Sequence, residues 1–207
     1  ARIVGMNDVD GSNGSAAAAS SSSMKAPNLD HPTLKRVKSG LSGKRFRATE
    51  FRGQTSLIVE PGDVHETLAF LRDDAECGYD FLADLYGVDY LNYPAATIGR
   101  FCVGYNLVST ARNDRFYVKT FLDASGPTEG IEQDPALVLD SVVDLWPAAE
   151  WMEREVFDMF GVRFNNHPDL RRILTWEDYP GHPLRKDYPL RGRGEREHFK
   201  IVDRSDA

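Results

Sequence analysis

The sequence has little cysteine, no long apolar run and no excess of positive charge. Its 207 residues include two cysteines, Cys77 and Cys102, and neither belongs to a Cys-x-x-Cys pair. Two thiols form no disulfide framework and are too few for an iron–sulfur cluster, which usually takes four. No window approaches the roughly 20 apolar residues of a membrane-spanning helix. No charged start followed by an apolar run indicates a secretory signal. We therefore expect a soluble chain in a reducing, cytosolic compartment.

Negative charge is concentrated in the middle of the chain. The formal net charge is −7, and residues 51–170 carry 8 basic against 21 acidic side chains. The two ends are slightly basic. Nucleic-acid binding needs clustered Lys and Arg on the folded body to neutralise phosphates, so the acidic middle argues against it.

Composition divides the chain into three parts. Residues 1–43 are predicted to be a flexible, low-complexity tail, because the Ala/Ser run 16–23 and its Gly-rich flank cannot offset the entropy of ordering. Met24 is a candidate natural start. Residues 44–166 are predicted to form the folded domain, and residues 167–207 an extended C-terminal arm.

Alternating apolar residues predict two antiparallel strand pairs. Residues 44–49 and 55–59 read as a hairpin, and residues 101–107 and 116–122 as a second pair. Residues 63–75 have capping-box spacing followed by one apolar face, which predicts a helix that covers the sheet.

Two further segments stay open between helix and strand: residues 81–90 and residues 136–143. The fold class expected from these patterns is α+β with two layers. In it, a mixed or mostly antiparallel sheet is covered by helices, and an extended C-terminal arm follows.

Between residues 144 and 161 the apolar residues recur with the spacing of a helix, which predicts a helix there. Gly161 is placed to end it in the left-handed conformation. Arg154, with Glu150 and Asp158 four residues to either side, is predicted to form a charge ladder. Trp151 and Phe157 fall outside the apolar stripe. Either the helix is sunk deeper in its own domain, or these rings contact a partner.

The arm is rich in proline and in large apolar side chains. Prolines push the residues before them toward extended conformations and deny a long helix. The arm's aromatic and leucine content exceeds that of a solvated tail, so we expect it to lie on another surface. The residues concerned are Pro168, Trp176, Tyr179, Pro180, Pro183, Leu184, Tyr188, Pro189 and Leu190.

No segment carries the pattern of a self-sufficient active site. His167 and His182 each precede a proline and are far apart in sequence, so they offer no convergent metal site. Cys102 is expected to be a small buried strand residue. Glu153 and Glu155 point about 200° apart on a helix and cannot jointly flank a bond. We predict no catalytic, metal or cofactor-binding residue, and keep a stand-alone metal-dependent hydrolase using the two histidines as an alternative.

Two blocks near the C-terminus closely resemble the signature of a known family. They are residues 153–161, Glu-Arg-Glu-Val-Phe-Asp-Met-Phe-Gly, and residues 167–174, His-Pro-Asp-Leu-Arg-Arg-Ile-Leu. The family is that of the 30-kDa subunit of respiratory NADH:quinone oxidoreductase (complex I). Residues 181–190 and 81–91 resemble further blocks of it, so the likeness spans roughly residues 45–190. The signature positions are Glu153, Arg154, Glu155, Asp158, Gly161, His167, Arg171, Ile173 and Leu174.

The resemblance implies a non-catalytic subunit of a proton-translocating complex. Such subunits lie in the peripheral arm of the complex and pack against its large hydrogenase-like (49-kDa-type) subunit near the quinone site. NADH, FMN, Fe–S clusters and quinone are expected on partner subunits, with the Fe–S subunits as further neighbours. The implied location is peripheral, on the cytoplasmic side of the inner membrane. An equivalent subunit of a membrane-bound hydrogenase or other-donor dehydrogenase complex is the main alternative.

The residues expected to contact partners lie on the helix and on the arm. Asp158 and Asp187 are expected to pair with neighbouring bases, within the chain or across the interface. The predicted contact residues are Trp151, Arg154, Phe157, Arg171, Arg172, Trp176, Arg185, Lys186 and Tyr188.

Overall fold

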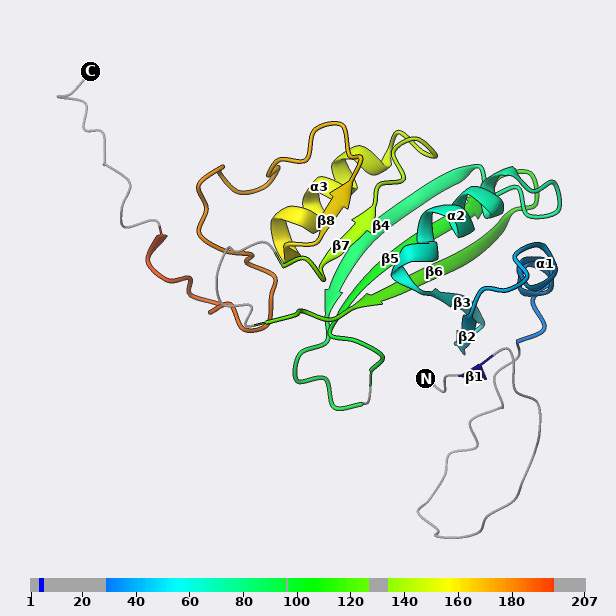
Figure 1. Ribbon diagram of the computed structural model, residues 1–207, viewed down its shortest axis with the longest axis horizontal. Helices are drawn as coiled ribbons and strands as arrows, with labels where there is room; N and C mark the ends of the chain where they lie inside the picture. Colours follow the sequence, from blue (N-terminus) through cyan, green and yellow to red (C-terminus); the bar gives the residue numbers. More distant parts are fainter. Residues whose placement is uncertain (1–3, 6–28, 96, 127–133, 196–207) are drawn as a thin grey trace, which may run out of the picture.

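The computed structural model describes residues 4–5, 29–95, 97–126 and 134–195. They form a six-stranded sheet in the order β1-β2-β3-β6-β5-β4, with helices on one side and a small parallel pair, β7 and β8, beside it (Figure 1). The strands are β1 Val4–Gly5, β2 Phe46–Phe51, β3 Gln54–Val59, β4 Phe81–Asp89, β5 Phe101–Ser109, β6 Asp114–Leu122, β7 Val138–Asp140 and β8 Arg163–Asn165. The helices are α1 Pro32–Gly40, the 3-10 turn η1 Pro61–Asp63, α2 Val64–Asp73 and α3 Ala149–Phe160.

The sheet is mixed, as the sequence predicts. Four of its strand pairs are antiparallel, and β3 pairs with β6 in parallel. Both predicted antiparallel pairs are confirmed, as β2–β3 and β5–β6. The α+β class with a covering layer of helices is confirmed as well.

One face of the sheet carries the core. Along β6 the residues from Phe116 to Leu122 alternate between buried and partly exposed, so one row of side chains points inward. Inward residues of the strands and the buried residues of all three helices join one hydrophobic cluster. All three helices therefore lie on the same side, and α2 is seen crossing the strands in Figure 1.

The two segments that the sequence left undecided between helix and strand both contain strands. Residues 81–89 form β4, an edge strand whose bulge shifts the register between Leu82 and Asp84. Residues 138–140 form β7. The helix expected from Asp144 begins at Ala149, because the backbone before it forms turns in which the N–H of Trp146 bonds the carbonyl of Val142.

The structure corrects part of the predicted flexible tail. Residues 32–40 form α1, whose Leu34 and Val37 are buried in the core. The His31 ring accepts the N–H of Thr33 and so caps the first turn. Residues 6–28 lie outside the described part of the chain. Among the described helices, none is long and apolar enough to cross a membrane.

Candidate partner-binding surface

The buried carboxylate of Asp158 fastens the arm to α3. It accepts the backbone N–H groups of Ile173, Leu174 and Thr175 at 3.1, 2.8 and 2.8 Å. It also pairs with the Arg172 guanidinium at 2.7 Å. Burial alone raises the pKa of a carboxyl, but hydrogen bonds from the hydroxyl and N–H of Thr175, from Arg172 and from the N–H of Leu174 hold the pKa of Asp158 below its usual value. Asp158 is therefore an ionised anchor for the arm.

The predicted charge ladder along α3 is wrong. Arg154 does not pair with its helical neighbours; its guanidinium donates to the carbonyls of Arg171 and Arg172 at 3.0 and 2.9 Å. Asp158 pairs with the arm instead. The ladder fails because the arm covers that side of the helix: its carbonyls accept from Arg154, and its N–H groups donate to Asp158.

A second set of contacts fixes the arm farther along. The N–H of Lys186 donates to the buried Asp89 carboxylate at 2.8 Å. Arg100 pairs with both Asp89 and Asp187, at 2.8 and 2.9 Å. Asp187 and Asp158 therefore both pair with bases of their own chain: Asp187 with Arg100 and Asp158 with Arg172.

Arg185 is buried rather than offered to a partner. Its side chain donates to the carbonyl of Phe160 at 2.7 Å, lies over the ring of Phe101, and is 4% exposed. Burial lowers the pKa of Arg185. The guanidinium groups of Arg185 and Arg172 are both engaged by groups of the chain itself, and their predicted partner contacts stay a prediction.

Large apolar side chains on α3 and the arm remain uncovered. Trp151 is 67% exposed, Leu174 64% and Leu184 51%, and Leu190 is fully exposed. Together with the hollow described below, these four residues make up what we call the arm surface. Of the four, Leu174 and Leu190 line that hollow. Large apolar side chains left exposed on a surface mark candidate interaction sites.

The other predicted contacts are distributed between surface and interior. Arg171 and Lys186 are exposed, whereas Phe157, Trp176 and Tyr188 are half-buried. Of the signature positions, Glu155 is exposed and Ile173 half-buried. The Phe157 ring lies 6.3 Å from that of His182, so Phe157 faces the arm of its own chain. Periodicity did not show which of these side chains face outward, and their contacts with a partner stay a prediction.

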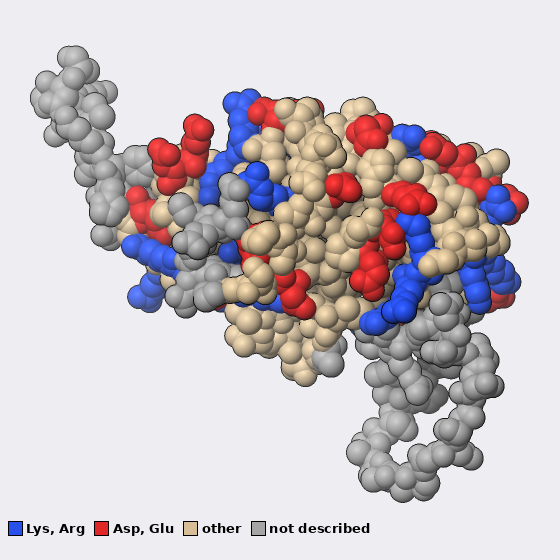
Figure 2. Space-filling model, in the orientation of Figure 1, with Lys and Arg blue, Asp and Glu red and all other residues tan. Residues whose placement is uncertain are grey.

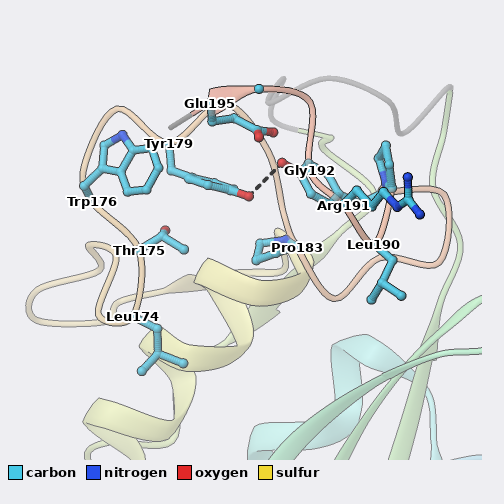
Figure 3. A pocket seen from close by; sticks show the side chains of 12 residues that line it. Leu174, Thr175, Trp176, Tyr179, Pro183, Leu190, Arg191, Gly192 and Glu195 are labelled. Carbon is cyan, nitrogen blue, oxygen red and sulfur yellow. Dashed lines mark hydrogen bonds between the residues drawn. The ribbon is translucent and has the colours of Figure 1, made fainter. Parts of the chain in front are cut away.

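The arm encloses a hollow of about 580 Å³ with aromatic walls (Figure 3). The Trp176 and Tyr179 rings pack edge to face with their centroids 4.7 Å apart. The hydroxyl oxygens of Tyr179 and Tyr188 are 2.7 Å apart and share a hydrogen bond. Such a hollow suits an apolar side chain of a partner. Its lining residues are Leu174, Thr175, Trp176, Tyr179, Pro183, Tyr188, Pro189, Leu190, Arg191, Gly192, Gly194 and Glu195.

The titratable residues considered for chemistry are engaged in backbone contacts. His167 bonds the Glu150 carbonyl through Nε2 at 2.9 Å and accepts the N–H of Asp169 through Nδ1. His182 Nδ1 bonds the Asp158 carbonyl, and burial lowers the pKa of His182 to about 4. Within the described ranges, no three His, Cys, Asp or Glu side chains are placed to hold a metal ion.

Both cysteines are buried, which fits the structural role expected for Cys102. Burial raises the pKa of Cys102 to about 12 and that of Cys77 to about 11. A thiol needs a depressed pKa to act as a nucleophile, so neither cysteine is placed for that chemistry.

Sequence reasoning missed the burial of Glu153. Its carboxyl is fully buried and accepts hydrogen bonds from the Ser141 hydroxyl at 2.7 Å and the Val142 N–H at 2.8 Å. Burial raises its pKa to about 7. A signal was present, because Glu153 lies four residues after Ala149 and three before Val156, on the apolar stripe of the helix.

Gly161 ends α3 with φ of +77°, in the predicted left-handed conformation. An added Cβ would contact the Arg185 guanidinium and lie 2.6 Å from His182 Nε2. We expect Gly161→Ala to destabilise the fold by about 2 kcal/mol, through backbone strain and displacement of the arm. Urea unfolding measures this change.

Gly53→Ala is the matched control for Gly161→Ala. Gly53 has a similar φ of +80° but nothing within 4 Å of an added Cβ. It therefore reports the backbone strain alone. Equal losses of stability in the two variants would show that the arm does not depend on the space at Gly161.

Comparisons with known proteins agree on one family. Residues 57–194 match the family described as the respiratory-chain NADH dehydrogenase, 30 Kd subunit. A relative from Roseiflexus castenholzii, named as a subunit of NADH-quinone oxidoreductase, is 43% identical over 163 residues, which cover 78% of this chain and 86% of that protein. The relative of the same name from Geobacter metallireducens is 44% identical over 151 residues, covering 73% and 83%.

Solved structures give the same result for the fold. A trypsin-resistant fragment (1–134) of Nqo5 superposes with a TM-score of 0.54 and 31% identity, covering 67% of this chain and 96% of the fragment. A chain of an archaeal membrane-bound sulfane sulfur reductase complex superposes with a TM-score of 0.60 at 20% identity, covering 83% and 92%. The second likeness shows the fold alone. The chain belongs to the family of the 30-kDa subunit of respiratory-chain NADH dehydrogenase.

Proposed function

We propose that this subunit braces the large hydrogenase-like subunit of complex I near the quinone site and carries out no reaction itself. The observation that carries the proposal is the arm surface, where Trp151, Leu174, Leu184 and Leu190 are exposed on a rigidly anchored segment. Exposed apolar anchors on a preordered surface favour binding, because little conformational entropy remains to be lost on docking.

The electron carriers are proposed to belong to the partners. NADH, FMN, Fe–S clusters and quinone would be held by other subunits, including the Fe–S subunits of the peripheral arm. The proposal is supported by the burial of both cysteines and by the backbone bonds of His167 and His182. We further propose a peripheral position on the cytoplasmic side of the membrane, reached through the partner subunits.

NADH is the proposed electron donor of the complex. The relatives whose sequences align over most of this chain are named as subunits of NADH-quinone oxidoreductase. An equivalent subunit in a hydrogenase or other-donor complex remains the second candidate, and the set of proteins in the purified complex distinguishes the two.

Trp151→Ala tests the arm surface directly. We expect about a tenfold loss of affinity for the large hydrogenase-like subunit, since truncating an exposed tryptophan anchor removes a large apolar contact. The measurement is the amount of that large subunit which co-purifies with a tagged chain over a series of concentrations.

Lys35→Ala is the control, because Lys35 is a similarly exposed side chain on α1, on the helical side of the sheet and outside the arm surface. It should leave binding of the large hydrogenase-like subunit unchanged. Retention of that subunit at the wild-type level by Trp151→Ala would contradict the assignment of the arm surface.

A further inference from the structure

The sheet has a second face, which no described element covers. The helices share a single core on the inward side of the strands, so the outward side chains of β2 to β6 face away from them. We call this side the outer sheet face. Its principal residues are Arg47, Tyr86, Tyr90, Arg115, Tyr117, Lys119 and Phe121.

A layer of aromatic rings lies on the outer sheet face. The Tyr86 ring lies against Gly104, its cross-strand partner, where a Cβ would collide with it. Tyr90 lies 6.0 Å from Phe121 and 5.3 Å from Tyr93, between ring centroids. The layer is apolar enough that burial raises the pKa of Tyr86 to about 12.

Positive charge borders these rings. Arg47, Lys119 and Tyr86 stand in one row across the sheet, through the pairs Arg47–Ile58, Ile58–Lys119, Lys119–Gly104 and Gly104–Tyr86. Arg47, Arg115 and Lys119 have no carboxylate within 4 Å in the described part of the chain. Among the described residues, Asp84 is the one acid at an outward strand position of β2 to β6.

The helical face is different. There, basic side chains pair with acidic ones, as Arg36 does with Asp74 and Lys44 with Asp63, at 2.7 Å each. Figure 2 shows charges of both signs interspersed over the face that it presents. Three cations with a single outward acid beside them therefore give the outer sheet face the opposite sign to the net charge of the chain, which is −7.

We infer that the outer sheet face docks an acidic amphipathic helix of a neighbouring protein in the complex. A sheet with helices on one side reaches a stable three-layer arrangement when a helix packs on its other side. The aromatic layer would take the apolar stripe of that helix, and Arg47, Arg115 and Lys119 would pair with its acidic flank.

A second copy of this chain fits the outer sheet face less well. A symmetric contact would place the same patch against itself, which sets cations against cations. The inference rests on the proposed function in one respect, namely that this chain works as a subunit. It concerns a surface separate from the arm surface, because the outer sheet face lies across the sheet from α3.

A photocrosslinking amino acid placed at Tyr117 in the assembled complex tests the inference. We expect an adduct with a helical segment of another subunit that carries several Asp or Glu residues. No adduct, an adduct with lipid, or one with a second copy of this chain would overturn it. The same probe at Lys35, which is 72% exposed on α1, should not crosslink to that segment.

Charge reversal supplies an independent measurement. Arg47→Glu with Lys119→Glu should lower the Tyr117 crosslinking yield about tenfold, because like charges then face the acidic helix. Lys35→Glu makes a charge change of the same kind on the helical face and should leave the yield unchanged. An unchanged yield in the double variant overturns the inference.

Vesicles containing about one-third anionic lipid test whether the outer sheet face binds lipid instead of a protein helix. Salt-sensitive binding of the full chain to them, lost in the double variant, would also count against a protein occupant. Normal retention of the large hydrogenase-like subunit with no Tyr117 adduct would refute this inference and leave the proposed function intact. Absence of the chain from the complex would refute both.

Discussion

Asp158→Ala should destabilise the fold by about 3–5 kcal/mol and release the arm from α3. The variant removes the ion-pair partner of Arg172, whose side chain is 11% exposed. It also leaves the N–H groups of Ile173, Leu174 and Thr175 without their acceptor. Each buried donor without a partner adds about 1–3 kcal/mol, although these costs are not additive.

Two measurements separate global from local effects of Asp158→Ala. Urea unfolding gives the total loss of stability. Limited trypsin digestion reports release of the arm, because Arg171 and Arg172 lie in the segment that Asp158 holds. We expect faster cleavage there than elsewhere in the chain.

Asp169→Ala is the matched control for Asp158→Ala. Asp169 forms an exposed ion pair with Arg171 at 2.8 Å in the same arm. Exposed pairs contribute at most about 1 kcal/mol, so this variant should be nearly neutral. If Asp158→Ala costs no more than Asp169→Ala, the buried carboxylate is not the anchor of the arm.

Glu153 should make the stability of the chain depend on pH between about 5 and 8. Its pKa is raised by burial from 4.5 to about 7. The folded chain therefore holds a proton that the unfolded chain has released at these pH values. The stability that this proton provides is complete below pH 4.5 and is lost as the pH rises through 7.

Glu153→Gln should remove this dependence, since its carbonyl oxygen can still accept the N–H of Val142 while its NH2 group can donate to the Ser141 hydroxyl oxygen. From pH 5 to pH 8, the wild-type chain should lose up to about 3 kcal/mol relative to the glutamine variant. The measurement is urea unfolding of both proteins at the two pH values. Equal pH dependence in the two proteins would contradict the raised pKa.

Neighbouring groups do not change this expectation. The Nε2 of His167 lies 3.9 Å from a Glu153 oxygen but is bonded to the Glu150 carbonyl, so it does not neutralise the carboxylate. His65 and Asp144 pair with each other at the surface and are present in both proteins, so they do not distinguish the two. Glu155→Gln, exposed on the same helix, supplies the matched control.

The sequence alone predicts local structure where the spacing of apolar residues matches the side chains that are buried and where a turn residue such as glycine marks the end of an element. The β2–β3 and β5–β6 pairs follow from strict alternation, and the C-terminal end of α3 follows from Gly161. Residues 81–89 stayed ambiguous because their apolar residues fit both periods, and pairing with β5 decides for the strand. The family signature identified the candidate region from contiguous residues alone.

Tertiary structure alone decided which charged groups are anchors and which residues face outward. Asp158 and Glu153 belong to one short helix, yet one is held ionised by the arm and the other is buried against Ser141. Periodicity assigns a face of a helix, but it does not say what covers that face. The burial and pairing of each side chain depend on segments distant in sequence, because the cost of desolvating a charge is set by the atoms that finally surround it.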